Sequence, residues 1–143
     1  MATTTATLRI SSSDLQGSPL SINATTTACK AGTSTGLDLM ESGKGKISES
    51  DGSKKLQVLP TALGDDGASK LYLCNNATDH SYYIDVDIHD TNLGRLYAGD
   101  WMFIPWSMTD TDAEIVIEAE PAGAVCPYEF ALFQEPQTLV AHS

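Results

Sequence analysis

Breaker residues divide this chain into short runs in which apolar and polar side chains alternate. No window places apolar residues at the i, i+3, i+4, i+7 spacing of an amphipathic helix, whereas alternation with a period of two is typical of a half-buried β-strand. Roughly nine or ten such runs, about 8–12 residues apart, predict an all-β fold, an antiparallel β-sandwich of the jelly-roll type. The expected strands are Thr3–Ser11, a run from Leu20, a run at Leu37–Leu39, Leu56–Leu59, Lys70–Cys74, Ser81–His89, Leu93–Tyr97, Trp101–Trp106, Ala113–Ala119 and Ala124–Phe133.

The expected core lies in the second half of the chain, where the alternation is densest. Its members are Leu71, Leu73, Tyr82, Ile84, Val86, Ile88, Ile115, Ile117, Cys126, Tyr128, Phe130 and Leu132. Residues 1–60 contain fewer large apolar side chains, which indicates an N-terminal β-arm or small β-layer before a main sandwich at 61–143. A single continuous domain over 1–143 is the alternative. Within the first part, the Gly-, Ser- and Lys-rich residues 42–54 are expected to form a loop.

Charge is distributed unevenly along the chain. Residues 1–70 carry seven acidic and seven basic residues, whereas residues 71–143 carry twelve acidic residues and one basic residue, Arg95, which gives a net charge of −11. Because phosphate groups are bound by Lys and Arg, neither nucleic acid nor an anionic membrane is an expected partner. No apolar run approaches the roughly 18 residues of a membrane span, and we expect no secretory signal, because basic and apolar N-terminal regions are missing.

Three groups of residues could carry chemistry, and each has a simpler interpretation. Asp85, Asp87 and His89 share one strand face as a conceivable metal set, but neighbours on such a face lie about 6.5–7 Å apart, which favours a solvent-facing strand. Residues 79–81 contain Asp, His and Ser as sequence neighbours, whereas a catalytic triad needs convergent geometry, so a turn is expected. The acidic run lacks a calcium-loop pattern and indicates a charged exterior. It consists of Asp110, Asp112, Glu114, Glu118 and Glu120.

Three cysteines lie far apart in the sequence, at Cys29, Cys74 and Cys126, without a C-x-x-C pair. An odd and scattered set argues against a disulfide framework or a zinc site and predicts ordinary buried thiols. None of these patterns implies a cofactor, and the chain is not expected to be an enzyme.

The stretch Leu93–Trp106 holds both tryptophans and is typical of a strand, an Ala-Gly-Asp turn and a second strand. One face of the second strand carries Trp101, Phe103 and Pro105, and the other carries Met102, Ile104 and Trp106. The core can cover one face, and the other requires a second sheet or another subunit, because large exposed apolar patches mark interaction sites. The predicted interface consists of Arg95, Leu96, Tyr97, Trp101, Phe103 and Trp106. On this interpretation Trp106→Ala weakens an oligomer and leaves the fold intact.

Arg95 lies shortly before this aromatic strand and has many acidic residues around it in the sequence. Its planar guanidinium suits a bidentate pair with a carboxylate. The expected partner is a carboxylate of the same chain such as Asp100, and a contact that holds two subunits in register is the alternative.

Four segments of the chain carry a resemblance to a known group of proteins. They are Ala6–Asp14, Lys30–Asp38, Leu71–Asn76 and Gly94–Trp106. In this order they resemble small structural proteins of tailed bacteriophages, notably those that infect marine and freshwater cyanobacteria. The resemblance implies a virion component, either a head decoration (cement) protein or a part of a fibre or tail. No motif in Lys44–Leu63 matches this group.

A decoration protein is the first function that the resemblance implies. Such a protein would be a homotrimer that binds the major capsid protein on the capsid exterior, after assembly in the cytoplasm of a bacterial host. The net charge of −11 favours solubility before assembly. The expected anchor is the polar N-terminal arm, which can add a strand to a neighbour's sheet edge. The anchoring residues are expected to include Thr5, Thr7, Leu8 and Ile10.

A fibre or spike domain that binds a host receptor or glycan is the second function considered. Exposed aromatic rings on a β-scaffold suit stacking against sugar rings. The candidate residues are Tyr97, Trp101 and Trp106.

Overall fold

The computed structural model describes residues 3–14, 17–37, 39–56, 69–88, 90–106 and 115–134. The described residues form strands that account for nearly all of the regular structure, with one short 3-10 turn, η1 (Glu49–Asp51). The strands are β1 (Thr5–Ser12), β2 (Leu20–Thr27), β3 (Leu39–Ser48), β4 (Lys54–Lys55), β5 (Lys70–Asn75), β6 (Tyr83–Ile88), β7 (Thr91–Tyr97), β8 (Trp101–Pro105), β9 (Ile115–Glu120) and β10 (Val125–Gln134).

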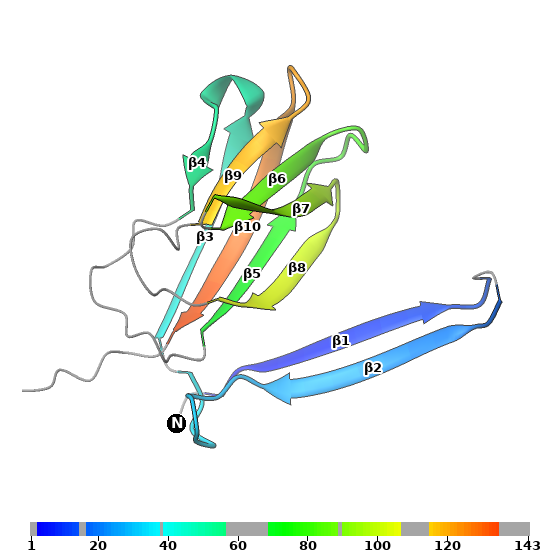
Figure 1. The fold of residues 1–143 in the computed structure, drawn as a ribbon, viewed down its shortest axis with the longest axis vertical. Helices are drawn as coiled ribbons and strands as arrows, with labels where there is room; N and C mark the ends of the chain where they lie inside the picture. Colours follow the sequence, from blue (N-terminus) through cyan, green and yellow to red (C-terminus); the bar gives the residue numbers. More distant parts are fainter. Residues whose placement is uncertain are drawn as a thin grey trace, which may run out of the picture.

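Strands β3 to β10 form a sandwich of two four-stranded antiparallel sheets (Figure 1). Sheet I has the order β3-β10-β5-β8, and sheet II has the order β4-β9-β6-β7. The first of these strands therefore pairs with the last, the second with the second last, and so on inward to β6 and β7. This nested pairing is the topology of a jelly roll. The predicted all-β sandwich is confirmed.

The hydrophobic core lies between the two sheets. Every predicted core residue either belongs to this cluster or packs against it as a partly buried side chain. Other buried members come from segments with weaker alternation, and the sequence prediction omitted them. They are Ile47, Leu56, Leu96, Trp106, Ala119 and Ala124.

The loop predicted for residues 42–54 is wrong for its first half, because β3 pairs with β10 through this segment. Gly43 and Gly45 lie on the inner side of β3, opposite Phe130 and Tyr128. A Cβ atom at Gly43 would lie 2.8 Å from Phe130 Cε1, and one at Gly45 would lie 2.7 Å from the Tyr128 hydroxyl oxygen. The two rings occupy the space that side chains of β3 would need. Glycine is therefore the residue that this strand requires.

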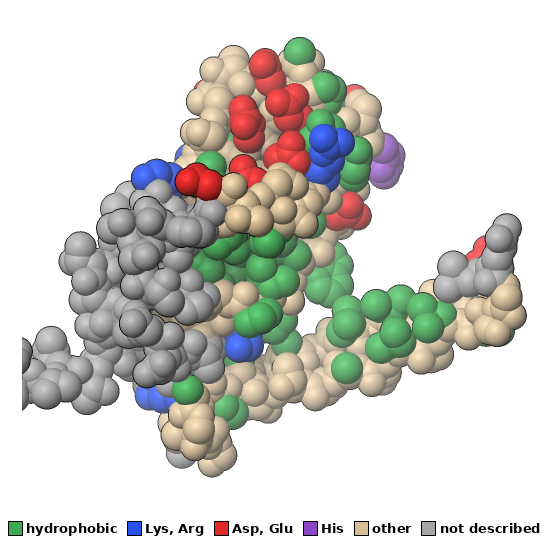
Figure 2. Space-filling view, viewed as in Figure 1, with side chains coloured by type: hydrophobic (Ala, Val, Ile, Leu, Met, Phe, Trp, Pro, Cys, Tyr) green, Lys and Arg blue, Asp and Glu red, His purple; other side chains and the backbone are tan. Residues whose placement is uncertain are grey.

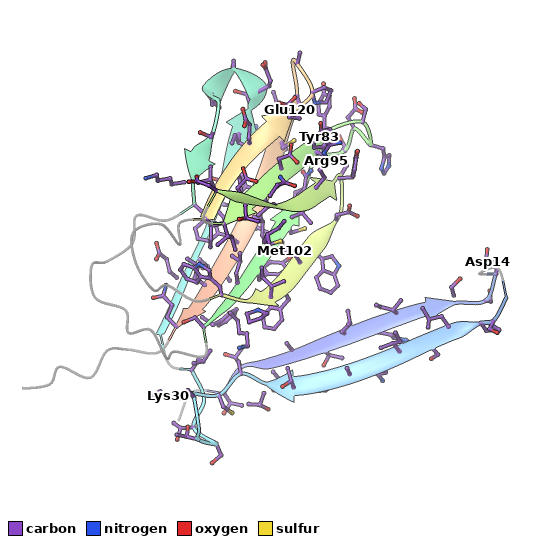
Figure 3. All side chains as sticks on the ribbon, viewed as in Figure 1. Asp14, Lys30, Tyr83, Arg95, Met102 and Glu120 are labelled. Atoms are coloured by element: carbon purple, nitrogen blue, oxygen red, sulfur yellow. The ribbon has the colours of Figure 1, made fainter. Side chains whose placement is uncertain are left out.

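Strands β1 and β2 form a separate antiparallel hairpin that projects from one end of the sandwich (Figure 1). Figure 3 shows Asp14 at the far tip of the hairpin and Lys30 near its base. Main-chain hydrogen bonds hold the base together, and two of them involve Ala28. The N–H of Ala28 donates to the carbonyl of Thr4 at 2.9 Å, and the N–H of Leu37 donates to the carbonyl of Ala28 at 3.0 Å.

The predicted boundary at residue 60 needs correction. Strands β3 and β4 pair with β10 and β9, so both belong to the sandwich. The part that stands apart is the hairpin with its base, which ends before β3 begins at Leu39. The pairing of β3 and β4 depends on strands about 60 to 95 residues further along the chain, which composition does not reveal.

The Ala-Gly-Asp turn predicted between β7 and β8 is confirmed, but the strands that it joins lie in different sheets. Asn75, which is fully buried, holds this corner from β5. Its Nδ2 donates to the carbonyl of Leu96 at 2.8 Å, and its Oδ1 accepts from the N–H of Ala77 at 2.9 Å. Its main chain also bonds both Gly99 and Asp100. One side chain thus ties sheet I to the end of β7.

Candidate interaction site

The alternation predicted for β8 is present, and the core covers one of its two faces. Met102, Ile104 and Trp106 face the core. Trp101 and Phe103 point to the outer side of sheet I, where Trp101 keeps 49% of its surface exposed. They continue an apolar outer surface, which we call the aromatic face. It consists of Tyr72, Trp101, Phe103 and Phe133, with the rings of Phe103 and Phe133 packed edge to face at 6.4 Å.

Two of the six predicted interface residues are corrected by the structure. Leu96 and Trp106 keep only 8% and 3% of their surface exposed and are members of the core. Alternation shows which residues share a face, but it does not show which face is inside. Because Trp106 lies in the core, we now expect Trp106→Ala to destabilise the fold rather than to leave it intact.

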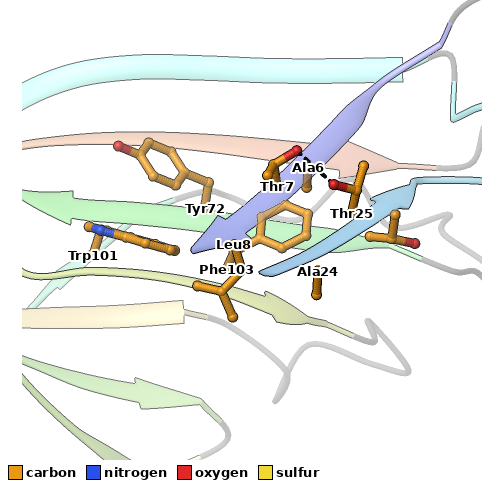
Figure 4. Close-up of a pocket in the computed structure, with 9 residues that line it drawn as sticks. Ala6, Thr7, Leu8, Ala24, Thr25, Tyr72, Trp101 and Phe103 are labelled. Carbon is orange, nitrogen blue, oxygen red and sulfur yellow. Dashed lines mark hydrogen bonds between the residues drawn. The ribbon is translucent and has the colours of Figure 1, made fainter. Parts of the chain in front are cut away.

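A cleft of about 460 Å³ separates the aromatic face from the base of the hairpin (Figure 4). Tyr72, Trp101 and Phe103 form the wall that belongs to the sandwich. The opposite wall belongs to the hairpin and consists of Ala6, Thr7, Leu8, Ala24, Thr25 and Thr26. Two largely apolar surfaces thus face each other across a gap.

The hairpin is amphipathic. Because its strands alternate, the side chains on one side are mostly apolar and those on the other are Thr, Ser, Arg and Asn. We call the apolar side the hairpin face; it consists of Ala6, Leu8, Ile10, Leu20, Ile22 and Ala24. Its four largest side chains keep between 36% (Leu8) and 42% (Ile10) of their surface exposed. Figure 2 shows apolar side chains gathered on the side of the hairpin that is turned toward the sandwich.

The predicted anchoring residues Thr5, Thr7, Leu8 and Ile10 all lie on β1, but β1 is not a lone arm. It pairs with β2 along its full length. The hydroxyl oxygens of Thr7 and Thr25 lie 3.2 Å apart across the pair (Figure 4). The sequence prediction missed the contribution of β2. Its signal was the second short alternation that begins at Leu20, directly after a Gly-Ser-Pro break.

A polar group borders the aromatic face on sheet I. The hydroxyl of Tyr72 donates to Glu129 at 3.1 Å, and the Lys44 ammonium lies 3.6 Å from the second oxygen of that carboxylate. Burial, together with hydrogen bonds that include the one to Glu129, raises the pKa of Tyr72 to about 12. This group links β5, β10 and β3 beside the cleft.

Tyr72→Phe is expected to change how stability depends on alkaline pH. The pKa of Tyr72 is higher in the folded protein than the ordinary value of 10.0, so its protonated hydroxyl favours the fold. That contribution is fully present below about pH 10 and is lost as the pH rises toward about 12. Urea unfolding at a series of pH values should therefore show a smaller alkaline loss for Tyr72→Phe. An equal loss in both proteins would contradict this assignment.

The outer face of sheet II differs from that of sheet I, because acidic side chains gather over β9 and β6 (Figure 2). The pairing brings Asp85 of β6 opposite Arg95 of β7 and Glu118 of β9. Arg95 Nε lies 3.4 Å from Asp85 Oδ1, and the guanidinium lies 4.5 Å from the ring centre of Tyr83 (Figure 3). The prediction that Asp100 pairs with Arg95 is wrong, because the carboxylate of Asp100 accepts a hydrogen bond from the N–H of Tyr97 instead.

The candidate chemical groups fall on this face and on a turn. Asn92 Nδ2 donates to Asp87 at 2.9 Å and lies 3.5 Å from Asp85, while His89 lies outside the described residues. The carboxylate of Asp79 accepts the N–H and hydroxyl of Ser81, which confirms the predicted turn. In the acidic run, Glu118 and Glu120 point outward from β9, and the others lie outside the described residues. Among the residues that the structure describes, no group of three metal-ligating side chains comes together.

The cysteines are free thiols, as predicted, but they differ in burial. Cys74 and Cys126 are buried, whereas Cys29 at the hairpin base is partly exposed. Burial raises the pKa of the Cys126 thiol, whose Sγ lies 3.7 Å from the carbonyl oxygen of Tyr83. Within the described ranges, no helix is long and apolar enough to cross a membrane.

The three aromatic residues considered for glycan stacking lie in different places. Trp106 is in the core, and Trp101 is on the outer side of sheet I. Tyr97 is on the outer side of sheet II, with its ring 5.1 Å from that of Tyr83. They form no common sugar platform.

The cleft with its two apolar walls is thus the candidate site. A scan of protein-family models and searches of curated proteins and of solved structures found no match to this chain.

Proposed function

We propose that this chain is a capsid decoration (cement) protein that binds the major capsid protein of a tailed phage through its hairpin. The observation that carries the proposal is the two-stranded hairpin, which projects from the sandwich with both outer edges unpaired in the described structure. A free edge can add a strand from another protein, and main-chain hydrogen bonds then supply the affinity. The resemblance of four segments to phage structural proteins supports the same role.

The composition of the hairpin supports attachment to a large partner. Between Thr5 and Thr27 the only charged residues are Arg9 and Asp14, in a chain whose net charge is −11. A nearly neutral segment can approach a partner without the repulsion that the acidic half would meet. In this proposal the protein is a homotrimer on the capsid exterior, assembled in a bacterial cytoplasm. Its role needs neither catalysis nor a cofactor.

The fibre or spike alternative has less support. The jelly roll alone does not decide between the two functions, because this fold serves many of them. A glycan site needs clustered aromatic rings, and Tyr97, Trp101 and Trp106 are dispersed over two outer faces and the core.

Co-sedimentation with undecorated phage heads tests the proposal. A variant that lacks residues 3–27 should keep the sandwich, because the described core cluster begins at Ile47, and should no longer bind heads. Arg95→Ala, which removes the contact with Asp85 on the outer face of sheet II, should lower stability slightly but still bind. Full decoration by the truncated variant would show that the anchor lies elsewhere. Binding at about a dozen copies instead of hundreds would favour the fibre role.

A further inference from the structure

We propose that the hairpin face packs on the aromatic face of a second copy of this chain, so that copies associate by exchanging hairpins. The partner is a second copy, and the two contact surfaces are the hairpin face of one copy and the aromatic face of the other. This inference does not rest on the capsid role. It uses the side chains of the hairpin, whereas capsid attachment uses the main-chain edges of its strands.

The hairpin leaves its larger apolar side chains partly exposed in the described part of the chain. Leu8 lines the cleft but stays 36% exposed, and the large side chains nearer the tip do not line it at all. Those side chains are Ile10, Leu20 and Ile22. A two-stranded hairpin is at best marginally stable in water, so its apolar side needs a cover. In this proposal the second copy provides that cover.

Charge selects where two copies can meet. Each copy carries a net charge of −11, and the outer face of sheet II holds Asp85, Asp87, Glu118 and Glu120. Two such faces repel each other. No member of the hairpin face or of the aromatic face is acidic, and Glu129, which borders the aromatic face, is paired with Lys44. The cores of protein interfaces are depleted in charge. These two surfaces are therefore the natural contact between copies.

The hairpin offers a second copy a surface along its length, because every residue of β2 is exposed. Contact with the aromatic face would remove the four largest side chains of the hairpin face from water, which favours association.

The contact is heterologous, because one copy contributes its hairpin face and the other contributes its aromatic face. Each copy can give its hairpin to one neighbour and accept a hairpin from another. Such contacts close into a ring, such as a trimer, or into a reciprocal dimer. In either form every aromatic face receives one hairpin.

Two full-length variants test the exchange by sedimentation. Ile22→Asp places a charge on the hairpin face, and Trp101→Glu places a charge on the aromatic face. Each variant alone should be a monomer where the wild type is associated, with the dissociation constant raised about 30-fold or more. An equimolar mixture should form a one-to-one complex, because the intact hairpin of the second variant can dock on the intact aromatic face of the first. The mixture is measured also at about tenfold higher concentration, since it forms one contact instead of a closed set.

Matched controls add the same charge elsewhere. Asn23→Asp changes the opposite side of β2, and Tyr97→Glu changes an exposed aromatic residue on sheet II; both should associate like the wild type. Circular dichroism and thermal unfolding check that the variants fold. If a charged variant does not fold, Ile22→Ser and Trp101→Ser replace the pair.

Three results would overturn the proposal. A wild type that stays monomeric at every concentration would mean that the occupant is a different protein. Association of Trp101→Glu alone would mean that hairpins pack on hairpins. Failure of the mixture to associate at both concentrations would show that the two surfaces do not meet.

Discussion

Trp106→Ala is expected to lower the free energy of unfolding by about 3–5 kcal/mol, the range for removing a buried aromatic side chain. Trp106 keeps 3% of its surface exposed and closes the core beside the end of β8. Its main-chain N–H also donates to the carbonyl of Ser69 at 3.0 Å, so the ring and the backbone fix the same point. Urea unfolding followed by far-ultraviolet circular dichroism measures the change.

The chain contains its own control, because it has only two tryptophans. Trp101 keeps 49% of its surface exposed on the aromatic face. Trp101→Ala should change the free energy of unfolding of the monomer by less than about 1 kcal/mol. Similar losses for the two variants would contradict the assignment of one ring to the core and the other to the cleft.

Asn75→Ala is expected to lower the free energy of unfolding by about 2–3 kcal/mol. The substitution leaves the carbonyl of Leu96 and the N–H of Ala77 without the side-chain partners they have at 2.8 and 2.9 Å. Leaving buried polar groups unpaired costs about 1–3 kcal/mol, and loss of the side-chain volume adds to this. The loss concerns the corner where the chain passes from sheet II to sheet I.

Asn76→Ala is the matched control for this position. Asn76 is exposed, and its side chain accepts only a weak hydrogen bond from the Cys74 thiol at 3.3 Å. Its substitution should therefore have a small effect. Hydrogen exchange offers a second measurement, since Asn75→Ala should speed exchange at Gly99, whose N–H donates to the Asn75 carbonyl at 2.8 Å. Unchanged exchange there would argue against a structural role for this side chain.

The sequence predicts the sandwich well because the core strands alternate. Leu71 and Leu73 share one inner face and Ile115 and Ile117 another, as a period of two requires. It does not predict β3, because two successive inner positions there are glycines, Gly43 and Gly45. The space is filled by rings from a strand about 85 residues further on. Composition alone therefore indicates a loop.

The candidate site is less predictable than the fold. Alternation identified Trp101 and Phe103 as one face, but only the sheet order shows that Trp106 lies inside. The partner of Arg95 depends on cross-strand register, which places Asp85 directly opposite it. Asp100 is nearer in sequence but belongs to the turn. Contacts that depend on the register between paired strands cannot be predicted from spacing along the sequence.

The two outer faces of the sandwich differ in chemistry, because the outer face of sheet I is largely apolar and that of sheet II is acidic. A copy held through its aromatic face would present Asp85, Asp87, Glu118 and Glu120 to the solvent, since they lie on the opposite sheet. A layer of such copies would have a negatively charged outer surface. A second layer that approached with the same face would meet electrostatic repulsion. Growth would then stop at a single layer, and raising the salt concentration would be the way to allow stacking.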